Sequence, residues 1–204
     1  MENWGGLTIG DNVTMEKRTL LRKGKAFLSA VAFYCYNFFI SHVPAYWIRH
    51  WYLRHILRIA IGLNSTVHMG CFFTGRKMRI GRDTVINRNS YLDGRGGLAI
   101  GSCVSISPES YILSLDHDPQ SPTFEAVAGP VVIEDYVWIG AHAMILPGVK
   151  LGKGCVVGAG AVVTKDIAEF SIVAGVPAAV ICQRNRQLNY SPRYAPYFNT
   201  DILP

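Results

Sequence analysis

Charged side chains are scarce in this chain of 204 residues, and its cysteines are few and scattered. Aspartate, glutamate, lysine and arginine supply 17% of the residues, whereas 50% are hydrophobic, a balance that argues against an intrinsically disordered chain. The five cysteines form no CxxC pair, and no histidine cluster has the spacing of a metal site. We therefore expect neither a disulfide framework nor a bound metal, and we expect a reducing, cytoplasmic compartment. The first six residues, MENWGG, lack the basic segment and apolar run of a secretory signal.

Acidic side chains are missing from one long stretch of the chain. None lies between Glu16 and Asp83, although twelve lysines and arginines do, and the net charge of the whole chain is +6. Such a stretch would be drawn to an anionic surface such as phospholipid headgroups, a nucleic acid or an acidic glycan. The alternative is a solvated basic face without a partner. A nucleic acid is disfavoured, because the basic residues flank apolar helices and belong to no base-reading motif.

The centre of this acid-free stretch is apolar. Residues 26–48 contain no lysine, arginine, aspartate or glutamate. The run approaches the ~20 residues that a bilayer span needs, but Asn37, His42 and Pro44 interrupt it. The pattern predicts two helices, the first over about 17–40 and the second over about 44–59.

The second predicted helix mixes aromatic and basic residues in the manner of an interfacial helix. Trp47 and Trp51 are interleaved with three basic residues, Arg49, Arg54 and Arg58. Three placements of the helical segment stay open at this point. It packs within an oligomer, lies on a membrane surface, or spans the membrane.

The rest of the chain is a repeat of six residues. Each unit starts with a large apolar residue, often continues with glycine, and carries a small or β-branched residue at its fifth position. The fifteen units start at Ile61, Val67, Phe73, Ile80, Ile86, Leu92, Ile100, Ile106, Ile112, Ile133, Ile139, Ile145, Leu151, Val157 and Val163. A period of six fits neither an α-helix nor a simple alternating strand. It fits a short strand and a tight corner, used three times per coil of a solenoid, with the first and fifth residues pointing inward.

The repeat sets the expected division of the chain. We predict a mainly β solenoid of about five coils over residues 61–182, preceded by a helical segment over 1–60 and followed by a tail over 183–204. One isolated unit, Leu7–Val13, precedes the predicted helices and has no place in this scheme.

The C-terminal half of the repeat carries a family resemblance. The segment from Ile133 to Asp166, followed by VAGVP at 173–177, resembles the hexapeptide-repeat acyltransferases. Within them it is similar to the galactoside, maltose and nodulation O-acetyltransferase branch, and to acetyltransferases encoded with polysaccharide genes. The resemblance implies a left-handed parallel β-helix, a homotrimer, and acetyl-CoA bound in the cleft between neighbouring helices.

The repeat breaks once, between Ile112 and Ile133, and we expect a loop near 116–130. A polar excursion from a regular solenoid is a natural place for a site. His117 lies at its root, and an imidazole suits the removal of a hydroxyl proton during acyl transfer. The neighbouring Asp116 and Asp118 could orient the ring, or contact the substrate. The alternative is an ordinary surface turn, but the position of His117 also matches the catalytic histidine of the family.

The resemblance extends to residues that would contact the acceptor. Asn87 matches an asparagine thought to contact the acceptor and stabilise the tetrahedral oxyanion, a role that suits an amide donor. Asp93 lies where the family has acidic residues, although the alignment there is offset by one or two positions. Trp138 is expected to cover the pocket as a lid. For each of these residues the structural alternative is an ordinary corner or core position.

For the cofactor, the resemblance points to small or polar residues at four positions, Ala141, Ala159, Thr164 and Lys165. The alanines would let the pantetheine arm lie close to the wall, and the lysine would pair with a phosphate of coenzyme A. Two arginines that hold phosphates in the galactoside branch are replaced here, by Ala179 and Cys182. We expect Arg184 or Arg186 to substitute for them. His142 is interpreted as a wall residue of the repeat, not as a second base.

These patterns favour an acetyl-CoA-dependent O-acetyltransferase acting on a sugar hydroxyl or glycan precursor, with His117 as base and no metal. The same mechanism with an amine or an antibiotic as acceptor stays open. So does a non-catalytic solenoid scaffold, against which the loop histidine and the Thr164–Asp166 run speak. A carbonic anhydrase of the same fold would need three metal-binding histidines, and the spacing of the repeat histidines does not supply them.

Overall fold

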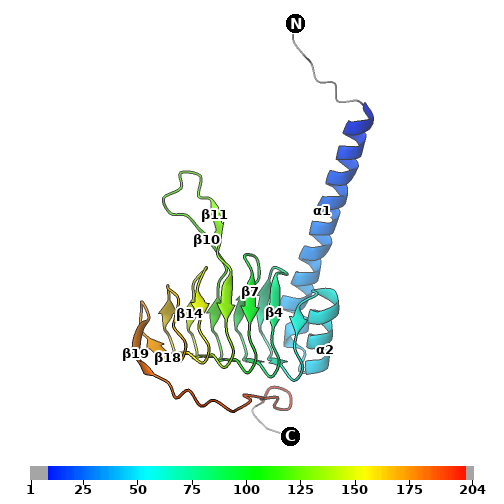
Figure 1. The fold of residues 1–204 in the computed structure, drawn as a ribbon. Coiled ribbons are helices and arrows are strands. Elements are labelled where there is room, and N and C mark those ends of the chain that lie inside the picture. The colour runs from blue at the N-terminus through cyan, green and yellow to red at the C-terminus, as the bar shows by residue number, and fades with distance from the viewer. Residues whose placement is uncertain (1–8, 201–204) are drawn as a thin grey trace.

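The structure, a computed structural model, describes residues 9–200, with the side chains described from residue 21 onward. It consists of a stack of triangular β-coils with helices at one end (Figure 1). A hairpin projects from the middle of the stack, and the C-terminal segment runs back along the coils toward the helical end. The predicted mainly β solenoid with a helical segment before it is confirmed.

Three sheets form the faces of five coils, and their strands are parallel except for the last, β19 (Ala179–Gln183), which pairs antiparallel with β18 (Ser171–Ala174). The first face contains β1 (Ala60–Ile61), β4 (Met78–Ile80), β7 (Leu98–Ile100), β12 (Val131–Ile133) and β15 (Lys150–Leu151). The second contains β2 (Thr66–Val67), β5 (Val85–Ile86), β8 (Ser105–Ile106), β13 (Trp138–Ile139), β16 (Val156–Val157), β18 (Ser171–Ala174) and β19 (Ala179–Gln183). The third contains β3 (Phe72–Thr74), β6 (Tyr91–Asp93), β9 (Tyr111–Ile112), β14 (Met144–Ile145) and β17 (Val162–Val163). Each of the fifteen predicted unit starts lies in a strand of its own.

The coils are held together by stacking and by backbone hydrogen bonds. On the second face, for example, Ile86, Ile106 and Ile139 follow one another in register, and all three are fully buried. At the corners, backbone N–H groups donate to carbonyls of a neighbouring coil, as Gly81 does to Ile100 of the next coil and Asp83 does to Leu63 of the preceding one. The glycine at the second position is required by this close approach, because a Cβ on Gly140 would lie 2.6 Å from the backbone nitrogen of Ala159. No coil buries its apolar side alone, so stability depends on the stack.

The helical segment differs from its expected bounds. Helix α1 spans Ile9–Phe38 and is followed by a single 3₁₀ turn, η1 (Ile40–His42). Helix α2 (Tyr46–Trp51) continues into one wider π-helical turn, η2 (Tyr52–Ile56). The isolated unit at 7–13 is not a strand where it is described, since residues 9–13 belong to α1; a lone repeat unit has no neighbour on which to stack. Within residues 9–200, no helix is both long enough and apolar enough to cross a bilayer.

Asn37 joins α1 to the open edge of the first coil. Its Nδ2 donates to the carbonyl of Phe73 at 3.0 Å, and its Oδ1 accepts the N–H of Phe73 at 3.0 Å. The neighbouring Tyr36 is fully buried with its ring against the Phe73 ring. An edge strand exposes unpaired backbone groups, and here a side-chain amide satisfies them. The residue that interrupts the apolar run therefore attaches the helix to the solenoid.

The expectation that Arg49 faces an interface together with Arg54 and Arg58 is wrong. Arg49 is fully buried, and its Nε and Nη2 donate to the carbonyl of Val67 at 3.3 and 3.1 Å. Its Nη1 donates to the carbonyl of Val43. A buried guanidinium needs such partners, and these connect α2 to β2 and to the preceding loop. Arg54 and Arg58 are exposed as expected.

The aromatic side of the same helix is open to solvent. Trp47 is 74% exposed and Trp51 is 54% exposed, so both indoles extend outward while Arg49 points into the protein. The exposed side chains of this segment therefore include its two tryptophans, Arg54 and Arg58.

Replacing Arg49 should destabilise the protein far more than replacing an exposed arginine. We expect Arg49→Met to lower the free energy of unfolding by about 2–4 kcal/mol, because two buried carbonyls lose a charged donor. Arg22→Met, at an exposed position of α1, should change it by less than about 0.5 kcal/mol. Urea unfolding followed by circular dichroism measures both. Equal effects of the two substitutions would contradict the anchoring role.

Candidate active site

The break in the repeat is a β-hairpin. Strands β10 (Leu115–His117) and β11 (Ala126–Ala128) pair antiparallel, with His117 opposite Ala126. The hairpin leaves the third coil after β9 and stands away from the stack (Figure 1). Because β12 then pairs directly with β7, the excursion does not disturb the register of the coils. The coils thus stay in register while this polar hairpin projects from them.

His117 is held in a defined orientation by Phe124, which lies in the hairpin loop just before β11. Its ring stacks on the ring of Phe124, with centroids 4.1 Å apart and an interplanar angle of 8°. Its Nδ1 lies 2.9 Å from the carbonyl oxygen of Phe124. A carbonyl only accepts hydrogen bonds, so in the neutral ring Nδ1 carries the proton and Nε2 has a free lone pair. The exposed imidazole is therefore prepared to accept a proton at Nε2.

The two aspartates beside His117 accept backbone N–H groups of the hairpin and do not orient the ring. Asp116 accepts the backbone N–H of His117 at 2.8 Å, and Asp118 accepts the backbone N–H of Gln120 at 2.8 Å. Neither carboxylate binds the imidazole, so both shape the loop backbone. Phe124 orients the ring instead. No sequence pattern indicated it, because the contact is made across the hairpin, seven residues away.

Four of the expected site residues lie along one edge of the solenoid, between the second and third faces. Asn87 follows β5, Ala141 follows β13 and Ala159 follows β16, at corresponding corners of the second, fourth and fifth coils. Trp138 lies at the start of β13 and is 46% exposed. Its Nε1 donates to the hydroxyl of Ser107 at 3.2 Å, which holds the indole against this edge.

Asn87 keeps part of its hydrogen-bonding capacity. Its Nδ2 donates to the carbonyl of Ile106 on the next coil at 2.9 Å, and the amide nitrogen carries a second hydrogen. The half-buried side chain is thus fixed by the stack. One N–H remains for a ligand.

The next edge, between the third and first faces, holds three further expected residues. The hairpin that carries His117 leaves the stack there, and Thr164 and Lys165 occupy the same edge after β17, both exposed. Among the described residues no hydrogen bond joins His117 to Asn87. One chain by itself therefore arranges its expected site residues along two edges with the third face between them.

Asp93 is inaccessible to a ligand in this structure. Its side chain is fully buried and forms an ion pair with Arg95, whose Nε lies 2.9 Å from Oδ1 and whose Nη2 lies 3.0 Å from Oδ2. Thr74 and the backbone N–H of Ser114 donate to it as well. Burial alone would raise the pKa of this carboxyl, but these hydrogen bonds outweigh it and hold the pKa below its usual value. The Asp93 carboxylate therefore stabilises the corner of the solenoid beneath the hairpin.

Arg184 also has a different role from the one expected. Its Nη1 donates to the carbonyls of Tyr136 and Gly154 at 2.9 and 3.1 Å, and its Nη2 donates to the hydroxyl of Tyr190 at 2.9 Å. These partners lie at the edge between the first and second faces or in the tail. The guanidinium therefore attaches the tail to the coils. Arg186 lies 3.6 Å from Glu169 in an exposed ion pair.

Comparison with known proteins adds to this geometry. A family model described as bacterial transferase hexapeptide (six repeats) matches residues 130–165. A solved galactoside acetyltransferase in complex with coenzyme A has a TM-score of 0.68 and 30% identity, covering 77% of this chain and 79% of its own. The chain belongs to the hexapeptide-repeat acyltransferase family.

Other members of the hexapeptide family differ in coverage and acceptor. The galactoside O-acetyltransferase of Escherichia coli K12 is 36% identical over 130 residues, 61% of this chain. A Vibrio cholerae acetyltransferase complexed with acetyl coenzyme A has a TM-score of 0.69 at 27% identity, covering 90% of this chain and 94% of its own. An N-acyltransferase of Bacillus cereus, solved with coenzyme A and dTDP-4-amino-4,6-dideoxyglucose, has a TM-score of 0.59 at 28% identity, covering 63% of this chain and 74% of its own.

The chain spans only part of its curated relatives. It covers 64% of the Escherichia coli enzyme, and 44% of a probable acetyltransferase of Mycobacterium tuberculosis that is 37% identical over 139 residues, 65% of this chain.

The buried carboxylate of Asp93 predicts a pH-dependent stability. We expect Asp93→Asn to lower the free energy of unfolding at pH 7 by about 1–3 kcal/mol, because the ion pair and a charged acceptor are lost. A carboxyl whose folded-state pKa is depressed stabilises fully above its unfolded pKa, and that contribution disappears as the pH falls through the folded pKa. The difference between the two proteins should therefore shrink below about pH 4.

Urea unfolding at a series of pH values measures this difference. Asp118→Asn, at an exposed carboxylate, serves as the control and should have little effect at any pH. A constant difference between Asp93→Asn and the parent protein from pH 7 to the acid range would contradict the assignment.

Proposed function

We propose that this protein is an acetyl-CoA-dependent O-acetyltransferase that acts on a hydroxyl of a sugar or glycan precursor. The observation that carries the proposal is the hydrogen bond from His117 Nδ1 to the Phe124 carbonyl, which leaves Nε2 as a base on the hairpin that interrupts the repeat. The coenzyme A complexes of the related galactoside and Vibrio cholerae enzymes support acetyl-CoA as the donor.

The proposed reaction is direct transfer. His117 Nε2 takes the hydroxyl proton while the acceptor oxygen attacks the thioester carbonyl carbon. The resulting tetrahedral oxyanion is stabilised by an N–H donor, for which Asn87 retains one hydrogen. The intermediate then expels the thiolate of coenzyme A, which receives the proton from the imidazolium.

The cysteines give no support for an acyl-enzyme. Burial raises the pKa of both Cys71 and Cys155 to about 12, so their thiols stay protonated and are poor nucleophiles. Neither lies in the hairpin that carries His117. Direct attack by the acceptor is the simpler mechanism.

The acceptor class is proposed from the relatives. The O-acetyltransferases among them favour a sugar hydroxyl and a role in polysaccharide biosynthesis. The Bacillus cereus N-acyltransferase keeps an amino sugar as the second candidate. Thioester consumption measured over a panel of free sugars, lipid-linked sugars and amino sugars separates the two.

The two edges of the solenoid support a homotrimer as the working form. A donor that contacts both the Ala141–Ala159 edge and the His117 hairpin would have to cross the third face of one chain. A neighbouring copy would instead place its hairpin against the free edge of the first. The same cleft would expose Thr164 and Lys165 to the phosphates of coenzyme A. Light scattering of the active protein tests this assembly, and an active monomer would contradict it.

We also propose that the helical segment docks on the cytoplasmic face of an anionic membrane. Four large side chains of α1, Phe27, Val31, Tyr34 and Phe38, are 41–69% exposed and recur at helical spacing. Arg22, Lys23 and Lys25 are exposed one to two turns before Phe27 and Val31. An apolar stripe with nearby cations and no carboxylate fits an anionic lipid surface.

Replacing His117 should abolish most of the activity while binding of the coenzyme A donor is retained. We expect His117→Ala to lower kcat by about 10²–10⁴, the usual effect of removing a general base, while coenzyme A binding measured by calorimetry persists. The matched control is His142→Ala, an exposed histidine paired at 3.3 Å with Glu109, which should cost less than about tenfold. Similar losses in both variants would argue against a specific base.

Reversing the charge of α1 should release the protein from anionic vesicles. The triple substitution Arg22→Glu, Lys23→Glu and Lys25→Glu removes cations that each contribute about 1 kcal/mol near such a surface. Co-sedimentation should show binding of the parent protein to anionic vesicles, weaker binding to neutral ones, and loss of binding in the variant. Equal binding to both vesicle types, or none, would favour the rival arrangement in which the stripe packs against another subunit.

A further inference from the structure

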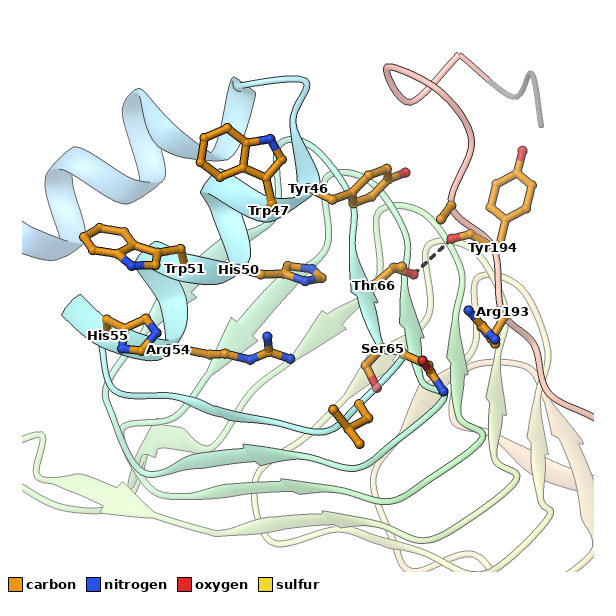
Figure 2. A pocket seen from close by; sticks show the side chains of 13 residues that line it. Tyr46, Trp47, His50, Trp51, Arg54, His55, Ser65, Thr66, Arg193 and Tyr194 are labelled. Carbon is orange, nitrogen blue, oxygen red and sulfur yellow. Dashed lines mark hydrogen bonds between the residues drawn. The ribbon is translucent and has the colours of Figure 1, made fainter. Parts of the chain in front are cut away.

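A second cleft lies at the helical end of the solenoid, two coils away from the hairpin. It has a volume of about 750 Å³ and is formed by three segments that are distant in sequence. Helix α2 with its π-helical turn supplies one wall, the corner before β2 supplies the floor, and the C-terminal tail supplies the opposite wall (Figure 2). None of the residues proposed for acetyl transfer lines it.

The wall formed by the C-terminal tail is held in place by contacts with the first coil and with α2. Thr66 donates to the carbonyl of Tyr194 at 3.0 Å, and the ring of His68 stacks on the ring of Tyr194 with centroids 5.6 Å apart. Five residues further on, Asn199 Oδ1 accepts hydrogen bonds from the hydroxyl of Tyr46 and the backbone N–H of Met69. These contacts fix the return of the tail over the first coil and hold Arg193 at the cleft.

The two walls each bring one arginine to the cleft. Arg54 comes from the helical wall and Arg193 from the tail, and Figure 2 shows both among the lining side chains. Arg54 uses Nη2 for the carbonyls of Ile61 and Gly62, which leaves its Nε and Nη1 hydrogens unused by the described residues. Arg193 has no hydrogen bond or ion pair to any residue between 9 and 200. The lining contains no carboxylate to neutralise either charge.

The helical wall also carries a neutral donor, His50. Burial and the charges of Arg54 and Arg49 lower its pKa to about 4, so the ring is neutral near pH 7. Its Nε2 accepts the backbone N–H of Val67 at 3.1 Å, and its Nδ1 therefore carries the proton. The cleft thus offers one neutral N–H and two guanidinium groups as hydrogen-bond donors. No carboxylate in its lining balances the positive charge.

The outer part of the cleft is apolar. Trp47, Trp51 and Leu63 line it and are 74%, 54% and 78% exposed. Exposed tryptophans and leucine beside unpaired cations suit a molecule with an anionic end and an apolar body. Guanidinium groups bind phosphate oxygens with particularly good geometry.

We propose that this cleft is a binding site for an amphipathic phosphate, separate from the acetyl-transfer site. Arg54 and Arg193 hold the phosphoryl group, His50 donates to it, and Trp47 and Trp51 contact the attached hydrocarbon chain. Its occupancy does not depend on acetyl transfer, and its test measures binding alone.

Calorimetric titration of the full chain with dodecyl phosphate, below its micelle concentration, tests the proposal. Inorganic phosphate and dodecyl maltoside are the comparison ligands, since each supplies one half of the proposed ligand. We expect dodecyl phosphate to bind at least tenfold more tightly than either. Arg193→Gln should weaken its binding about tenfold or more, and Trp47→Ala should weaken it too, while Arg79→Gln, an exposed arginine outside the cleft, should leave it unchanged.

The outcomes are separable. Equal affinity for inorganic phosphate would show that the tryptophans contribute nothing and would overturn the amphipathic ligand. Equal affinity for dodecyl maltoside, or full binding by Arg193→Gln, would overturn the phosphate site. Both Arg193 and Trp47 are exposed, so these variants should fold, and their circular dichroism serves as the check. His117→Ala should bind dodecyl phosphate normally, which separates failure here from failure of the proposed acetyl transfer.

Discussion

Coil-on-coil stacking is the constraint on which the rest of the protein depends. A coil with strands of two or three residues has no core of its own, so each inward residue is buried only by its equivalents on the neighbouring coils. The two ends of the stack therefore need covers. At the first coil, Asn37 satisfies the backbone of Phe73, and Arg49 binds the carbonyl of Val67. At the last coil, the segment after β18 covers β17, since Val162 donates to Gly175 and accepts from Ala178.

The regular stack explains why the residues proposed for acetyl transfer lie at its edges and on the hairpin that interrupts the repeat. A side chain on a corner is repeated at the spacing of the coils, which gives straight edges suited to a long donor such as coenzyme A. Corner residues have similar surroundings in every coil, whereas the proposed base needs surroundings of its own. The hairpin supplies that difference: Phe124 stacks on His117 and accepts from Nδ1, so a contact within the excursion itself leaves Nε2 as the nitrogen of the proposed base.

The helical end carries properties that the solenoid does not need. Its tryptophans, the apolar stripe of α1 and the unpaired arginines of the second cleft all face outward, while the residues that attach it to the coils are buried. Anchoring and exposure are thus divided between different sides of the helical segment. This division is consistent with the proposed membrane-facing role of the helical end and with the proposed phosphate site beside it.

The period of six determined the strands, their order and the position of the single excursion, because it records which residues must point inward in every coil. It also indicated His117, since a break in a regular repeat is visible without any coordinates. The periodicity could not assign Arg49, Asp93 or Arg184. Each of these side chains is placed by carbonyls or donors on another coil or another segment, and such partners leave no pattern in the local sequence. Only the tertiary structure decided that they are internal supports, and only the return of the tail over the first coil created the second cleft, because both depend on chain segments that meet after the coils have stacked.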